Sequence, residues 1–142
     1  MGRKVKGMTG QRDRSKYGAS PFGFEDLDAY KEARQLRRAI YRLAKTLPPE
    51  EKYALAQQMR RASVSLTNNI AEGYGRFHWQ ESLQFVRHSR GSLMELVDDL
   101  NVCEDENYAS QETLLPLRNQ AETVLRLVNG YGAYLERMKA ES

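Results

Sequence analysis

Five basic side chains between positions 31 and 45 are spaced so that an α-helix would gather them on one face. With about 100° between successive residues, they lie within roughly 80° of one another. Like charges at this spacing repel one another, and a polyanion relieves the repulsion by placing phosphates between them. A face that is merely solvated is the equally weighted alternative. The set, called the cationic stripe below, is Lys31, Arg34, Arg38, Arg42 and Lys45, with Arg60, Arg61 and Arg76 as candidates to extend the same surface.

A second group of basic residues lies at the start of the chain. Residues 1–23 hold six basic side chains against one acidic side chain, together with five glycines and little to bury. We expect this segment to be disordered when free, and a flexible basic arm is a common means of holding a phosphate backbone. A solubilising leader is the alternative. The six basic residues are Arg3, Lys4, Lys6, Arg12, Arg14 and Lys16.

The residue types that usually carry catalysis or bind metals do not occur in productive patterns. His78 and His88 are ten residues apart, which does not place them on one helical face, and no Cys or acidic spacing completes a zinc site. Gly73 and Gly75 lack the third glycine of a dinucleotide fingerprint. A lone Cys103 is more often a core residue than a nucleophile. We therefore predict no catalytic residue, no metal and no cofactor.

The elements that must position these residues read as helices. Apolar residues recur in alternating steps of three and four, the pattern of a helix that buries one line of side chains. The prolines at 48–49, the glycines at 73 and 75, and the polar stretch 104–110 separate four such segments. The pattern predicts an all-α fold, an antiparallel up-down-up-down four-helix bundle over residues 24–142, preceded by the arm at 1–23. The expected buried lines are Ala29, Ala33, Leu36, Ile40, Leu43 and Leu47; Leu55, Met59, Ala62, Leu66, Asn69 and Gly73; Trp79, Leu83, Val86, Arg90, Leu93, Val97 and Leu100; and Leu114, Leu117, Ala121, Val124, Val128, Tyr131, Leu135 and Met138.

Two positions in these expected lines are polar. A buried Asn69 would fix the register of the helices, and a buried Arg90 would need carboxylate or amide partners. Glu72 and Glu95 are the nearest carboxylates, and Gly91 would let two backbones approach closely. We interpret the four residues Asn69, Glu72, Arg90 and Glu95 as a structural polar network between the second and third helices, with ligand binding as the alternative.

Length and composition indicate the compartment. The chain has 142 residues and a single cysteine, which is enough for one domain and fits a reducing cytoplasm. No apolar run reaches the roughly 18–20 residues that span a bilayer, and no secretory signal precedes the helices. We expect a cytoplasmic protein without membrane contact.

The central segment carries a family resemblance. Residues 60–76 read RRASVSLTNNIAEGYGR and residues 90–96 read RGSLMEL. These motifs resemble the four-helix bundle proteins encoded in intervening sequences of bacterial 23S ribosomal RNA genes, and are similar to the accessory variability determinant proteins of diversity-generating retroelements. The resemblance covers about residues 24–138. Tyr30 replaces a usual tryptophan, Ser82 a common aromatic residue, and His78 an expected Ser or Thr cap, which puts the start of the third helix in question.

The resemblance implies a non-enzymatic protein that assembles as a homopentamer. In the retroelement branch it implies binding of RNA and of a reverse transcriptase. The second half of the chain favours an alternative, a protein-interaction scaffold of the rRNA-linked branch without direct nucleic-acid binding, because residues 72–142 hold 7 basic against 12 acidic side chains.

Overall fold

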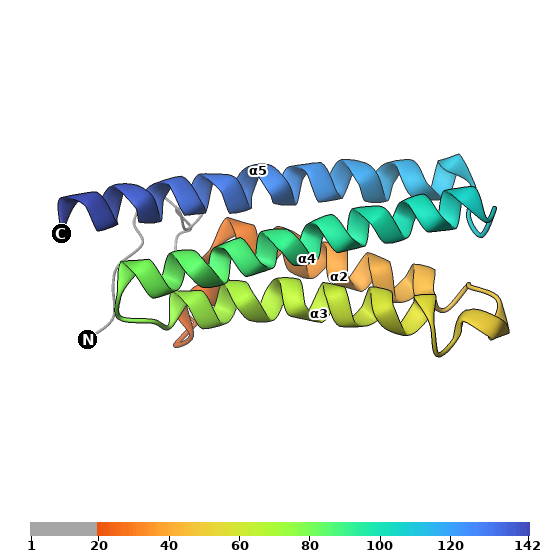
Figure 1. Ribbon diagram of the computed structural model, residues 1–142, viewed down its shortest axis with the longest axis horizontal. Helices are drawn as coiled ribbons and strands as arrows, with labels where there is room; N and C mark the ends of the chain where they lie inside the picture. The colour runs from red at the N-terminus through yellow and green to blue at the C-terminus, as the bar shows by residue number, and fades with distance from the viewer. Residues whose placement is uncertain (1–19) are drawn as a thin grey trace.

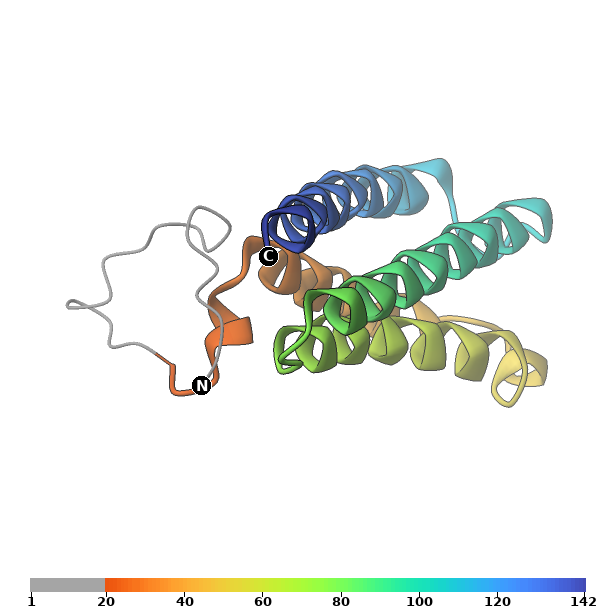
Figure 2. The same ribbon diagram turned by 60° about the vertical axis from the view of Figure 1, so that its left-hand side comes forward.

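The computed structural model describes residues 20–142, which form four long α-helices with no strand among them. The helices are α2 (Asp28–Ala44), α3 (Leu55–Tyr74), α4 (Trp79–Asp105) and α5 (Gln111–Glu141), and they alternate in direction along the long axis (Figure 1). Each helix packs against two neighbours in the cyclic order α2, α3, α4, α5, and α4 lies between α3 and α5 in Figure 2. The predicted antiparallel up-down-up-down bundle is confirmed.

The first predicted helix, over residues 24–47, is divided. A short 3-10 helix, η1 (Gly23–Asp26), precedes α2, and Leu27 between them is extended. After α2, a turn over residues 45–47 completes the segment. Every residue of the expected apolar line is nevertheless buried, because Leu27 and the turn keep the side chains on the side of the core. The buried residues of that line are Ala29, Ala33, Leu36, Ile40, Leu43 and Leu47.

The second helix does not begin directly after the prolines at 48–49. Pro49 begins a 3-10 helix, η2 (Pro49–Glu51), as suits its fixed φ, and α3 starts only at Leu55 because Ala54 is not helical. Glu51 joins these pieces. Its Oε1 accepts from the Leu55 N–H at 3.3 Å, and its Oε2 accepts from the Tyr108 hydroxyl at 2.7 Å.

The predicted buried line of α4 is wrong at three positions, of which the first, Trp79, is half-buried. Arg90 is exposed and Val97 is half-buried, whereas Ser89 and Leu96 are buried. A serine can occupy the core because its hydroxyl bonds within its own helix, and Ser89 Oγ donates to the Val86 carbonyl at 2.8 Å. At Arg90 and Val97 the buried residue lies one place earlier than the apolar pattern indicated, whereas Leu83, Val86, Leu93 and Leu100 are buried as predicted.

Asn69 is also displaced from its expected place, because Ile70 and not Asn69 lies in the core of α3. Asn69 is half-buried, and its Nδ2 donates to the Ser65 carbonyl at 2.8 Å. A polar contact between α3 and α4 does exist, but serines make it: Ser92 Oγ donates to Ser65 Oγ at 2.9 Å. The expectation of a polar contact at this interface holds, with different residues.

The two glycines near the α3–α4 hairpin have opposite surroundings. A Cβ on Gly73 would lie 2.9 Å from Phe85 Cβ and 3.1 Å from the Ser82 carbonyl oxygen, so this glycine permits close packing of the hairpin. Gly91 is exposed, and a Cβ there would meet nothing within 4 Å. The predicted close approach at Gly91 is wrong, since that face of α4 points to solvent.

The last helix, α5, is continuous over 31 residues. Ser110 caps its start, where Ser110 Oγ accepts from the Thr113 N–H at 3.3 Å. Neither Pro116 nor the Asn129–Gly130 pair interrupts it. Arg118 fastens α5 to α4, because it donates to Glu104 at 2.6 Å.

Candidate nucleic-acid interface

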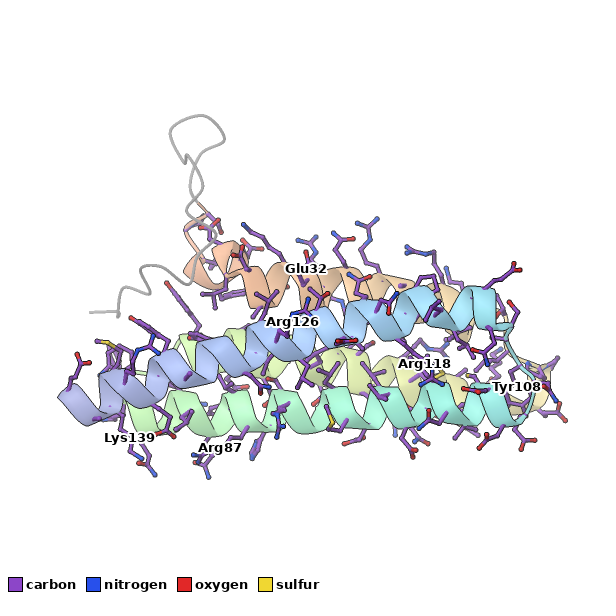
Figure 3. All side chains as sticks on the ribbon, turned by 90° about the horizontal axis from the view of Figure 1, so that it is seen from above. Glu32, Arg87, Tyr108, Arg118, Arg126 and Lys139 are labelled. Carbon is purple, nitrogen blue, oxygen red and sulfur yellow. The ribbon has the colours of Figure 1, made fainter. Side chains whose placement is uncertain are left out.

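The cationic stripe lies along α2 on the side away from the core. Arg34, Arg38, Arg42 and Lys45 are exposed, and within residues 20–142 none of these four pairs with a carboxylate. Lys31 is half-buried and lies 3.9 Å from Asp28. Figure 3 shows nitrogen-tipped side chains projecting from α2 away from the rest of the bundle. Four of the five cations of the stripe thus lack a carboxylate partner among residues 20–142, and the fifth, Lys31, is paired with Asp28.

The neighbouring helix α3 adds two of the three further arginines. Arg60 is half-buried, Arg61 is exposed, and both line a groove of about 510 Å³ with Tyr41 of α2. This groove is called the α2–α3 groove below. Arg76 lies at the far end of α3, where it donates to Glu72 at 2.7 Å and stacks on the Phe85 ring, 4.6 Å from the centroid.

Two residues of this surface did not figure in the sequence prediction. Arg37 is half-buried and donates to Thr67 Oγ1 on α3 at 2.8 Å, so it joins the helices while its charge remains beside the stripe. Tyr41 is half-buried among the cations. An aromatic residue three or four positions from several basic residues is a signal that could have identified Tyr41, whereas the partner of Arg37 depends on how α2 and α3 align.

The basic residues of the predicted arm cannot be placed on this surface. They lie outside the residues that the structure describes, and their role stays a prediction. The residues concerned are Arg3, Lys4, Lys6, Arg12, Arg14 and Lys16.

The four residues of the predicted polar network are not brought together. Glu72 pairs with Arg76, which follows the end of α3, and Asn69 bonds within α3. Arg90 faces a groove between α4 and α5, whereas Glu95 lines a different groove beside Arg61. Because Arg90 is exposed, it does not need the buried partner that the network was meant to supply.

Comparison with known proteins assigns the sequence to a family. The model of the 23S rRNA-intervening sequence protein family matches residues 25–130, which include α2, α3 and α4 entirely. The chain belongs to this family. No curated protein matches it. The predicted family is therefore confirmed, and the cationic stripe and the α2–α3 groove lie in the matched part of this 23S rRNA-intervening sequence protein.

The end of the bundle near the α4–α5 connection contains buried ionisable groups. Asp99 is only 2% exposed; its Oδ1 accepts from Gln58 Nε2 at 2.9 Å, and its Oδ2 has no partner among the described residues. Burial, with the nearby charges of Asp98 and Glu95, raises the pKa of Asp99 to about 6. An uncompensated carboxyl in the core is costly to ionise.

The nearby thiol and phenol are weakly acidic. Burial, with the charges of Asp99 and Glu51, raises the pKa of Cys103 to about 11. The hydrogen bond to Glu51 raises the pKa of Tyr108 to about 12. A nucleophilic cysteine needs a lowered pKa and access, so Cys103 has the character of a core residue.

Residues 20–142 contain neither a metal-binding cluster nor a helix that could cross a membrane. No group of three or more His, Cys, Asp or Glu side chains could hold a metal ion there. Within the same residues, none of the helices combines the length and apolar character needed to cross a membrane.

Proposed function

We propose that this family member is a non-enzymatic, oligomeric accessory protein that binds RNA through the cationic stripe and acts beside a reverse transcriptase. The observation that carries the RNA-binding part is the row of four exposed cations along α2 and at its end, none of which pairs with a carboxylate within residues 20–142. Each phosphate contact releases a counterion and adds a salt-dependent share of affinity. Support for the reverse transcriptase comes from the resemblance to the accessory variability determinant proteins.

Assembly into a homopentamer belongs to the same proposal and rests on the same resemblance. An assembly would cover exposed apolar side chains, and Phe22 and Phe77, which are 63% and 67% exposed, are candidates for such a contact. Light scattering on the full chain measures the mass of the assembly. A monomer at micromolar concentration would rule out this part of the proposal while leaving RNA binding open.

The binding test uses the full chain and a fluorescently labelled RNA at several salt concentrations. Replacing Arg34, Arg38 and Arg42 by glutamine removes three phosphate contacts, so the slope of log affinity against log salt should fall by about two for single-stranded RNA. The matched control replaces Arg87, Arg126 and Arg137, which are exposed cations on α4 and α5. Equal affinity and slope in the stripe variant would refute the proposed surface.

The second candidate function is a protein-interaction scaffold that does not contact nucleic acid. It is favoured by the charge of residues 72–142, which is −5 from 7 basic and 12 acidic side chains and would repel RNA from α4 and α5. A pull-down that recovers the same protein partners after nuclease treatment, together with no RNA cross-links to the stripe, would favour the scaffold.

A further inference from the structure

The α2–α3 groove contains an aromatic side chain where a purely electrostatic surface would need none. Tyr41 lines both this groove and an adjoining one of about 280 Å³, whose other residues are Arg37, Arg38, Arg42 and Lys45. Its ring is therefore the shared wall between the cations of α2 and the surface of α3. Being half-buried, the ring has fewer orientations available than a fully exposed tyrosine.

The α3 side of the groove offers hydrogen-bonding groups suited to a planar polar ligand. Asn68 is exposed and has no hydrogen-bond partner among the described residues, so its amide can donate and accept. Asn69 Nδ2 is used by Ser65, which leaves Oδ1 as an acceptor. Side-chain amides recognise base edges in this manner.

The electrostatic balance of the groove favours an anion. Arg60 and Arg61 lie on its α3 wall. The one carboxylate among its lining residues, Glu72, is neutralised by Arg76 at 2.7 Å. A polyanion that follows the cationic stripe can thus pass along the groove without meeting a free negative charge.

We infer that the α2–α3 groove binds single-stranded RNA, with an unpaired base stacked on Tyr41 and the backbone held by the cations of α2. This inference rests on the proposed RNA-binding function and adds the class of substrate. Single strands are held by the combination of a basic track and aromatic platforms. In a duplex the base faces are already stacked, so Tyr41 would have nothing to contact.

The test compares three probes on the full chain: a labelled single-stranded RNA of about 16 nucleotides, at the upper end of typical site sizes, the same sequence as a duplex, and inorganic polyphosphate, which has charges but no bases. Tyr41→Ala should weaken single-strand binding about ten-fold, as expected for one lost stacked base. It should leave duplex and polyphosphate binding within two-fold. Tyr41→Phe should retain single-strand binding, because the stacking face remains.

Two further variants keep the test decisive if Tyr41→Ala loses its fold. Asn68→Ala, at an exposed position, should weaken single-strand binding about three-fold, as expected for one neutral hydrogen bond, with no effect on polyphosphate. Tyr53→Ala is the control, since Tyr53 is 79% exposed and does not line the α2–α3 groove.

The outcomes separate this inference from the proposed function. If Arg38→Gln weakens RNA binding while Tyr41→Ala and Asn68→Ala do not, the stacking site is refuted and the stripe stands. If Tyr41→Ala weakens all three probes equally, Tyr41 has a structural role and the inference is likewise refuted. If none of the probes binds the unmodified chain, the proposed function itself fails.

Discussion

The buried carboxyl of Asp99 gives a prediction with a definite sign and size. Replacing it by the isosteric asparagine removes the charge but keeps an oxygen that can accept from Gln58 Nε2, which lies 2.9 Å from Asp99 Oδ1. In the folded protein burial raises the pKa of Asp99 to about 6, from an ordinary value of 3.8. The native state therefore binds the proton more tightly than the unfolded state, and stability falls as pH rises between these two values.

The size of this effect on the unfolding free energy follows from the difference between the two pKa values of Asp99. A pKa difference of about two units corresponds to roughly 3 kcal/mol of unfolding free energy above pH 6. Asp99→Asn should therefore stabilise the bundle by about 1–2 kcal/mol near neutral pH, which is the roughly 3 kcal/mol less about 1–2 kcal/mol for the buried amide nitrogen without an acceptor. Towards pH 4 the gain should shrink, because the native carboxyl of Asp99 is then already neutral.

The assay is chemical denaturation followed by circular dichroism at several pH values. Asp98→Asn is the matched control, since it removes the same charge from an exposed neighbour on α4 and should change stability by less than about 0.5 kcal/mol. If Asp99→Asn is less stable at neutral pH, or if its gain in stability does not vary with pH, the cost of ionising Asp99 in the core does not determine the difference in stability.

Three further predictions concern the helices themselves. Gly91→Ala should raise the free energy of unfolding by about 0.5–1 kcal/mol, because the added methyl meets nothing within 4 Å and alanine favours the helix; a loss on thermal denaturation would contradict the open surroundings of Gly91. Gly73→Ala should lower it by about 1–2 kcal/mol, since its Cβ would lie 2.9 Å from Phe85 Cβ and the crowding outweighs the gain in helix propensity; an unchanged melting temperature would show that the hairpin adjusts. Cys103 should resist alkylation at about pH 8 in the folded protein and react once unfolded, because it is buried and its pKa is about 11; rapid native labelling, followed by mass spectrometry, would refute this.

The parts of the fold that could be predicted are those where apolar residues alone mark the core. The lines through α2 and α5 were correct except that Met138 is half-buried, because an apolar side chain occupies every inward position of these lines. In α4 the pattern failed at Arg90, since the inward position belongs to Ser89, whose hydroxyl is satisfied within the helix. A small polar residue of this kind gives no hydrophobic signal.

Part of the candidate site could likewise be predicted from the sequence, and part could not. The cationic stripe lies opposite the apolar line of α2, so the spacing of its residues was enough to predict that it faces away from the core. The Arg37–Thr67 bond joins residues 30 positions apart, and the shape of the groove around Tyr41 depends on the alignment of two helices. Core packing between α2 and α3 decides this alignment, and the spacing of residues along the sequence does not reveal how the side chains of two helices pack.

The contacts of Glu51 make the two ends of the bundle unequal. Through Leu55 and Tyr108, this carboxylate ties the α2–α3 connection to the α4–α5 connection, so the end that contains both connections is fastened. At the opposite end α5 projects past the turn between α3 and α4 (Figure 1). Fraying should start there, and amide hydrogens in the last turns of α5 should exchange with solvent before those in its first turns. Local unfolding of the bundle should therefore begin at the C-terminal end of α5 and proceed towards the end that Glu51 holds together.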